Sequence, residues 1–167
     1  MLYFLVGFMG SGKSHMGRRL AKQLDIPWVD MDKEIERAEG RTINDIFAES
    51  GEDYFRQLER DYLLQLDKDQ DLIVATGGGA PCFYDNMKTM NEKGRTLYLN
   101  RKKEVVIAQL MKGLHRRPLL KGKTQEQVME YYDAVMKERR PYYEQATIFV
   151  EELNYLDIAQ MISSGWL

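Results

Sequence analysis

The sequence predicts an α/β fold with three layers, in which helices cover both faces of a five-stranded parallel sheet. One observation is that short strand-like runs alternate with helical stretches along the 167 residues, as in chains whose parallel strands are joined by helices. Another is a glycine-rich segment directly after the first strand-like run, where such a sheet places a ligand-binding turn. A chain of this length fits one domain, residues 1–167.

The individual elements follow from the apolar patterning. Leu2–Val6 is apolar throughout, as expected of a strand buried on both faces, and apolar residues of Lys13–Leu24 recur at helical spacing. The other predicted strands are Trp28–Val29, Leu72–Thr76, Arg95–Leu99 and Thr147–Val150. The other predicted helices are Asp32–Ala38, Ile43–Ser50, Glu52–Leu66, Asn86–Glu92, Lys103–Met111, Gln125–Arg139 and Asn154–Ile162. Right-handed crossovers would bring ligands to the carboxyl ends of these strands.

Composition and charge argue against several classes of protein. With 44% hydrophobic and 30% charged residues, the chain does not have the composition of a disordered protein. The net charge of −2 does not favour binding to nucleic acid. No apolar run approaches the length of a membrane span, no export signal is evident, and the single cysteine, Cys82, fits a reducing compartment. We therefore expect a cytoplasmic monomer without nucleic-acid or membrane partners.

The segment Gly7–Ser14 (GFMGSGKS) fits the phosphate-binding pattern G-x-x-x-x-G-K-[ST], known as the P-loop. Its glycines let backbone N–H groups close around an anion, and the following helix directs its positive N-terminal end at the same phosphates. Lys13 can reach the β- and γ-phosphates of a nucleotide, and the Ser14 hydroxyl can ligate Mg²⁺. A flexible glycine turn is the alternative, but the complete pattern between a strand and a helix favours a nucleotide site.

Two carboxylates, Asp30 and Asp32, follow the second predicted strand. Residues two apart on an extended segment point the same way, so both could face the cleft. One could hold a metal-bound water, and the other could orient an acceptor hydroxyl and take its proton. The alternative, that either residue only caps the next helix, is about equally compatible with the residue types.

The run Thr76-Gly77-Gly78-Gly79 follows the third predicted strand. Successive glycines allow backbone N–H groups to approach a ligand closely, although a plain turn would also use them. A strand of this kind in a nucleotide-binding sheet usually ends in an acidic residue that supports the metal, and this one ends in Thr76. Asp30 is the obvious substitute.

A basic segment, residues 112–123, carries five Lys or Arg residues, two glycines and one proline. Such a loop can form a mobile lid that closes over a triphosphate, excludes water and supplies Arg117 to the transferred group. A solvated surface loop is the alternative. Arg56 and Arg139 lie in charge-rich predicted helices, where residue types alone assign them no role.

Taken together, these stretches resemble the shikimate kinase family of P-loop kinases. The matching stretches are Gly7–Ser14, Val29–Glu36, Ile43–Phe47 with Gly51, Glu52, Phe55 and Arg56, Thr76–Gly79, Arg117–Leu120, and Glu138-Arg139 with Pro141, Tyr143 and Glu144. The resemblance covers residues 2 to 150 approximately, and the ordered combination is far more specific than the P-loop alone.

The resemblance implies Mg²⁺-dependent transfer of the γ-phosphoryl group of ATP to the 3-hydroxyl of shikimate, with Lys13, Asp32 and Arg117 as catalytic residues. It implies that ATP is held by Gly10, Ser11, Gly12, Lys13, Ser14, His15 and Arg117. It implies that shikimate is held by Asp32, Arg56, Gly77, Gly78, Gly79 and Arg139, and the metal by Ser14 and, through water, Asp30. Family members often carry a further arginine on the helix before the lid, where this chain has Leu110, Lys112 or Arg116.

Two alternatives remain open from the sequence. A kinase of the same build could act on another polyol acid such as gluconate, or on a nucleoside monophosphate. A nucleotide-dependent switch or binding module would need no acceptor pocket, but only about 15 residues follow the last predicted strand, which leaves little room for an effector domain.

Overall fold

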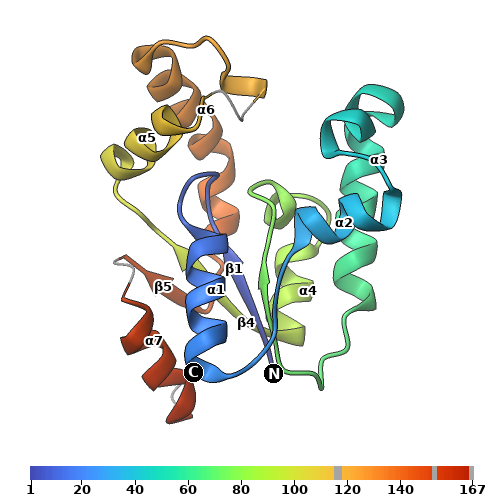
Figure 1. Ribbon diagram of the computed structural model, residues 1–167, viewed down its shortest axis with the longest axis vertical. Coiled ribbons are helices and arrows are strands. Elements are labelled where there is room, and N and C mark those ends of the chain that lie inside the picture. Colours follow the sequence, from blue (N-terminus) through green and yellow to red (C-terminus); the bar gives the residue numbers. More distant parts are fainter. Residues whose placement is uncertain (115–117, 152–153, 166–167) are drawn as a thin grey trace.

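A five-stranded, all-parallel sheet forms the centre of the molecule (Figure 1). The structure is a computed structural model that describes residues 1–114, 118–151 and 154–165. The strands are β1 (Leu2–Val6), β2 (Trp28–Asp30), β3 (Leu72–Ala75), β4 (Gly94–Leu99) and β5 (Ile148–Val150), in the order β2-β3-β1-β4-β5. Strand β1 is central because it pairs with β3 on one side and β4 on the other.

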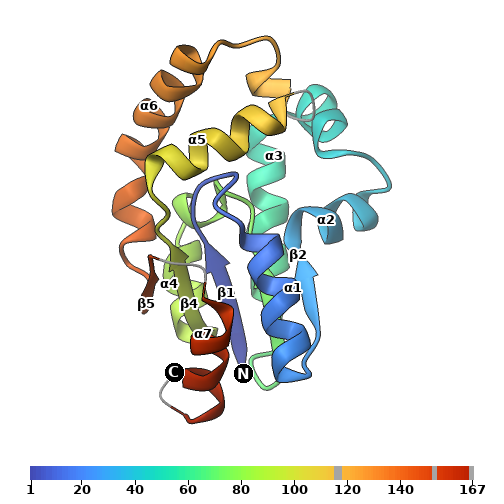
Figure 2. The same cartoon turned by 60° about the vertical axis from the view of Figure 1, so that its left-hand side comes forward.

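Helices pack on both faces of this sheet, which confirms the predicted three layers. The α-helices are α1 (Lys13–Leu24), α2 (Met31–Glu39), α3 (Ile43–Gln65), α4 (Asn86–Lys93), α5 (Lys103–Lys112), α6 (Gln125–Tyr143) and α7 (Tyr155–Ser163), with 3₁₀ turns at η1 (Ala80–Cys82) and η3 (Pro118–Leu120). Side chains of β1 alternate between two hydrophobic cores, Leu2 and Phe4 in one, Tyr3 and Leu5 in the other. Figure 2 shows α1 and α7 together over one face, and α3 and α4 lie behind the sheet.

The predicted boundaries agree with the structure to within one residue, except at the end of α6. The sequence predicts two helices on either side of Gly51, and the structure agrees: the backbone of Gly51 (φ 82°, ψ 172°) is not helical, so the element labelled α3 consists of two helical segments that meet at a kink there. Helix α6 continues past the predicted end at Arg139 to Tyr143 and includes Pro141. Capping boxes at Thr42 and Thr124 satisfy backbone groups at the first turns of α3 and α6.

The segments that contain the predicted site residues follow the carboxyl ends of the strands. The glycine-rich loop follows β1, α2 follows β2, the three glycines follow β3, and the connector to α5 follows β4. In Figure 2 the loop after β1 lies beneath α5, and a Cβ atom at Gly10 would come 3.0 Å from Leu110 of that helix. No helix within the described ranges is long and apolar enough to cross a membrane.

Candidate active site

The loop between β1 and α1 has the backbone that its glycines predict. Gly7, Gly10 and Gly12 all have positive φ, at 138°, 78° and 97°, a region that side-chain-bearing residues rarely adopt. Gly7 also lies tightly against β4, because a Cβ atom there would come 3.1 Å from the Leu99 carbonyl oxygen. Gly12 is the N-cap of α1, so the positive end of that helix opens onto the loop.

A cleft of about 510 Å³ opens above this loop. It is lined by Met9, Gly10, Ser11, Gly12, Lys13, Ser14, His15, Asp30, Asp32, Thr76, Gly78, Arg101, Val105 and Gln109. The cleft therefore brings together residues that follow four different strands. Most of the predicted nucleotide contacts and both predicted carboxylates are among its walls.

Lys13 is held against the backbone of its own loop. Its Nζ atom donates hydrogen bonds to the carbonyl oxygens of Gly7 (2.7 Å) and Phe8 (2.9 Å). Burial lowers the pKa of Lys13 to about 8, although Asp32 and Asp30 oppose that shift. The ammonium group remains mostly protonated at neutral pH, and its third N–H can serve an anion in the cleft.

Asp30 does not cap α2. It ends β2 and occupies the N-cap position, but its side chain makes no capping hydrogen bond. Instead, Ser14 Oγ donates a hydrogen bond of 2.7 Å to Asp30 Oδ2. Thr76, at the end of β3, has its hydroxyl turned inward to the Leu5 carbonyl oxygen.

The Ser14–Asp30 pair suits a magnesium ion. Both offer hard oxygen atoms, and Mg²⁺ is usually held by one or two protein groups together with waters and substrate phosphates. No group of three or more potential His, Cys, Asp or Glu ligands occurs in the described part of the chain. The donor set therefore fits Mg²⁺ better than a metal such as zinc, which needs a closed cage of side chains.

Asp32 lies in the first turn of α2 and also lines the cleft. The helix begins at Met31, so the two carboxylates reach the same cleft from a strand end and a helix start, not from one extended segment. Burial, followed by the charge of Asp30, raises the pKa of Asp32 to about 6. Asp32 Oδ1 is buried without a hydrogen-bond partner among the described residues, so it is available to a ligand.

Arg56 of α3 is a buried arginine, 7% exposed, with a fixed position. Its Nη1 atom donates to Glu59 Oε2 at 2.7 Å, and its Nη2 atom donates to Glu52 Oε1 at 2.8 Å. The guanidinium carbon lies 4.1 Å from the centre of the Phe83 ring. These contacts orient the guanidinium group like a fork at the edge of the site.

The three glycines after β3 make room for the charged groups around them. A Cβ atom at Gly77 would lie 2.7 Å from Asp32 Oδ1, and one at Gly79 would lie 2.6 Å from Arg56 Nη1. At Gly78 it would lie 3.3 Å from the Met9 nitrogen and 3.6 Å from Arg139 Nη1. The glycine turn thus lies directly against the P-loop, Asp32, Arg56 and Arg139, which are far apart in the sequence.

Helix α6 fixes the same turn from the other side. The Tyr143 hydroxyl donates a hydrogen bond of 2.5 Å to the Gly78 carbonyl oxygen. Because α6 continues past Pro141, Arg139 and Tyr143 lie one turn apart on one rigid element. Arg139 therefore reaches the glycine turn from α6, whereas Arg56 reaches it from α3.

Sequence reasoning missed Glu59, which has no exposed surface. Burial raises the pKa of Glu59 to about 7, against the opposing charge of Arg56. Its Oε1 atom has no hydrogen-bond partner among the described residues and would lie 2.8 Å from a Cβ atom at Gly77. Its spacing of three residues from Arg56 on a helix is the only signal in the sequence, and that spacing is common on solvated helix faces.

Comparison with known proteins identifies the family. The family model for shikimate kinase matches residues 9–164. The chain belongs to the shikimate kinase family. Shikimate kinases from Bacteroides thetaiotaomicron and Persephonella marina are 40% and 43% identical over 143 and 145 residues. These alignments cover 86% and 87% of this chain, and 82% and 85% of the relatives.

Solved structures of the shikimate kinase family share the fold. The crystal structure of the enzyme from Bacteroides thetaiotaomicron has a TM-score of 0.91 and 34% identity, covering 99% of this chain and 98% of that one. The enzyme from Acinetobacter baumannii, solved in complex with shikimate, has a TM-score of 0.84 and 34% identity, covering 99% and 92%. The family resemblance and the fold predicted from the sequence are both confirmed.

The lid that the shikimate kinase resemblance predicts at residues 112–123 is only partly described. Arg117 and Arg116 lie outside the described residues, so their predicted contacts with ATP remain predictions. Leu110 is fully buried and packs against Gly10, while Lys112 lines an adjoining cavity that shares Asp30 and Asp32 with the cleft. His15 is exposed at the start of α1 and lines the nucleotide cleft.

Proposed function

We propose that this member of the shikimate kinase family transfers the γ-phosphoryl group of ATP to the 3-hydroxyl group of shikimate, forming shikimate 3-phosphate and ADP. The observation that carries this proposal is the continuity between two half-sites. A phosphate-binding loop opens into the same cleft as Asp32, and the glycine turn beside it touches two arginines that come from different helices. Family membership supports ATP as the phosphoryl donor.

The nucleotide half binds and neutralises phosphate. The backbone N–H groups of Gly10, Ser11 and Gly12, the N-terminal end of α1 and the free N–H of Lys13 would surround the β- and γ-phosphates. Arg117 would add a second cation from the lid. Ser14 and Asp30 would hold Mg²⁺, the latter through water, and the bound ion neutralises phosphate charge.

The acceptor half suits a polyol that carries a carboxylate. Arg56 and Arg139 would bind the shikimate carboxylate, because guanidinium groups pair with that planar anion through two hydrogen bonds. Glu59 and Glu52 hold Arg56 in place for this role. The backbone at Gly77, Gly78 and Gly79 would lie against the ring, since no side chain there keeps it away.

Asp32 would act on the reacting hydroxyl. With a pKa of about 6, its carboxylate is ionised at neutral pH yet basic enough to accept the hydroxyl proton. As the acceptor oxygen forms its bond to phosphorus, the bond to the ADP oxygen breaks and the proton passes to Asp32. The remaining contribution is positioning: the groups above hold acceptor and phosphate in line and exclude water.

A coupled ADP-release assay tests the proposed substrate. Shikimate, gluconate and CMP are each supplied with Mg-ATP, and a reaction without acceptor measures hydrolysis. ADP formation with shikimate is expected to be at least about a hundredfold faster than with the other acceptors. Only an acceptor that presents a carboxylate to the two arginines and a hydroxyl group to Asp32 at the same time satisfies all three residues. Equal activity with gluconate or CMP would assign the chain to another acceptor, and ADP release without any acceptor would favour a nucleotide-dependent switch.

We further propose that the protein acts as a monomer in the cytoplasm, without nucleic-acid or membrane partners. The slight net charge of −2 and the single, half-buried Cys82 support this proposal. Light scattering after size exclusion tests the monomer directly, since a dimer would double the mass of 19.6 kDa.

A further inference from the structure

The order of the strands determines where the nucleoside part of ATP must go. The proposed acceptor groups follow β2 and β3 or lie against the turn after β3, and the phosphate loop follows β1. The γ-phosphate has to face the acceptor, so the rest of the nucleotide extends away from β3. In the order β2-β3-β1-β4-β5, that direction leads to the segment after β4. The reasoning rests on the proposed function for the side on which the acceptor binds.

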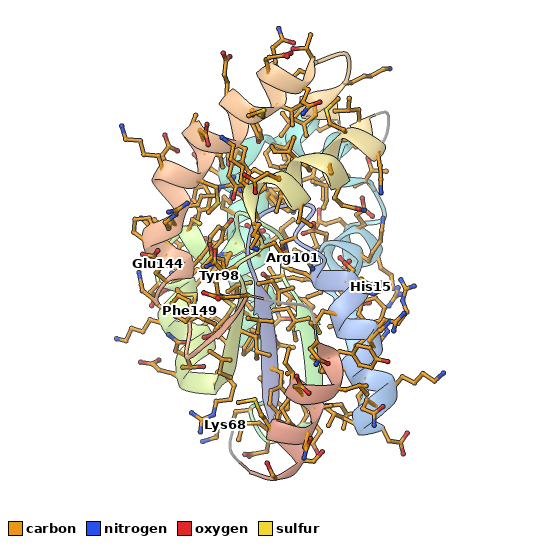
Figure 3. The ribbon with its side chains drawn as sticks, turned by 90° about the vertical axis from the view of Figure 1, so that its left-hand side faces the viewer. His15, Lys68, Tyr98, Arg101, Glu144 and Phe149 are labelled. Atoms are coloured by element: carbon orange, nitrogen blue, oxygen red, sulfur yellow. The ribbon has the colours of Figure 1, made fainter. Side chains whose placement is uncertain are left out.

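Arg101 occupies that segment. Its backbone N–H donates to the Leu99 carbonyl oxygen at 3.1 Å, and the preceding Asn100 N–H donates to Val150 at 2.9 Å. These hydrogen bonds attach the connector that contains Arg101 to the ends of both β4 and β5. The half-buried Arg101 side chain lines the same cleft as the P-loop and His15. In Figure 3, Arg101 lies near the base of α5 and His15 at the start of α1.

The guanidinium group of Arg101 has no protein partner within the described ranges, in either ion pairs or hydrogen bonds. Arg56 and Arg60, by contrast, each pair with a carboxylate at 2.7 Å. A cation that lines a cleft without being paired to a carboxylate is free to contact a ligand. Among the described residues from Arg101 to Gly113, Arg101 is the positively charged residue that lines this cleft, and Lys112 lines an adjoining cavity that shares Asp30, Asp32 and Gln109 with it.

The neighbours of Arg101 are not those of a simple phosphate site. Val105 and Gln109 lie one turn apart on α5 and line the same cleft as Arg101. Val105 is 43% exposed, so its methyl groups offer an apolar contact that a phosphate would not use. A flat guanidinium group beside an exposed apolar side chain provides a surface for a purine ring.

We propose that Arg101 binds the nucleoside end of ATP, with its guanidinium group against the adenine base and Val105 as the apolar neighbour. The triphosphate is already served by Lys13, the loop amides and the start of α1. Arg101 thus adds affinity for the nucleoside and favours a nucleotide over a bare polyphosphate. Its interaction with the base is of the cation–π type, for which arginine is better suited than lysine.

Calorimetric titration of the full chain without shikimate tests the proposal, using Mg-ATP and Mg-tripolyphosphate as the two ligands. Arg101→Ala should weaken Mg-ATP binding about tenfold and change tripolyphosphate binding by less than about twofold. Arg101→Lys keeps the positive charge but loses the planar guanidinium group, so its affinity for Mg-ATP should lie between those of the wild type and Arg101→Ala. Lys102→Ala is the matched control, since it removes the adjacent charge outside the cleft and should leave both affinities unchanged.

Equal losses for Mg-ATP and tripolyphosphate would overturn the proposal by making Arg101 a phosphate contact, and unchanged ATP affinity would remove Arg101 from the site. Thermal unfolding of each variant checks folding, and if Arg101→Ala unfolds, Arg101→Lys carries the same comparison. The two proposals can fail separately. A wild-type protein that does not phosphorylate shikimate refutes the proposed acceptor while the ATP and tripolyphosphate titrations still decide the role of Arg101.

Discussion

Replacing Asp32 with asparagine removes one negative charge at the centre of the proposed reaction and keeps the shape of the side chain. The variant cannot accept the hydroxyl proton, and general base catalysis contributes about 10²- to 10⁴-fold to turnover. We therefore expect kcat to fall by about that factor. Mg-ATP affinity should change little because Lys13, Ser14 and the loop amides are untouched.

The same substitution should make the protein more stable. Burial and Asp30 raise the pKa of Asp32 from 3.8 to about 6, so the folded state binds this proton more tightly than the unfolded state does. The cost of ionising Asp32 is absent below about pH 4, grows as the pH rises, and is complete above about pH 6. Asparagine does not ionise, so Asp32→Asn should gain about 1–3 kcal/mol at pH 7; the attraction between Lys13 and Asp32 is already included in the pKa of about 6.

The assay combines steady-state kinetics, ATP titration and chemical denaturation at pH 7 and pH 4, with Asp53→Asn as the control. Asp53 is an exposed carboxylate on α3 and should alter neither turnover nor stability. Most of the stability gain of Asp32→Asn should be lost at pH 4, where the wild-type carboxyl group is protonated in the folded state and about half protonated in the unfolded state. Near-normal turnover would refute the role of Asp32 as general base. A loss of stability at pH 7 would refute the claim that ionised Asp32 destabilises the folded state.

Three further substitutions separate the halves of the site. Arg139→Ala should raise the KM for shikimate about 10- to 100-fold in steady-state kinetics, while Arg140→Ala, the exposed neighbour on α6, should not; equal effects would contradict the carboxylate role. Gly79→Ala places a Cβ atom 2.6 Å from Arg56 Nη1, so it should weaken shikimate binding and spare Mg-ATP, as two separate titrations can show. Ser14→Ala removes the hydroxyl bonded to Asp30, so half-maximal activity should need about tenfold more Mg²⁺; an unchanged Mg²⁺ titration would exclude Ser14 as a ligand.

The strands and most helix ends could be predicted from the sequence because they depend on local patterns. Leu2–Val6 and Lys13–Leu24 agree with the structure at both ends, since an uninterrupted apolar run and a helical repeat begin and stop there. The predictions were less accurate where tertiary packing overrides local preference. Helix α6, predicted to end at Arg139, continues through Pro141 to Tyr143, whose hydroxyl group contacts the Gly78 carbonyl oxygen.

The candidate site was predictable from the sequence only in part, and the reason is geometric. Gly7–Ser14 forms a site by local backbone geometry, so its pattern is visible in the chain. Arg56 and Arg139 have no such local signal, and only the family resemblance indicated their importance before the fold brought both to one glycine turn. Glu59 and Arg101 could not be found in this way, because a buried acid in a charged helix and a lone arginine in a connector resemble ordinary surface residues in sequence.

The central claim is that one cleft joins ATP to the 3-hydroxyl group of shikimate, and ³¹P magnetic resonance of the reaction mixture tests it most directly. With Mg-ATP and shikimate, the wild-type protein should produce one new phosphomonoester for each ADP, coupled to the proton on carbon 3 of the acceptor. A signal of inorganic phosphate in its place, or a phosphomonoester coupled to another ring proton, would contradict the account.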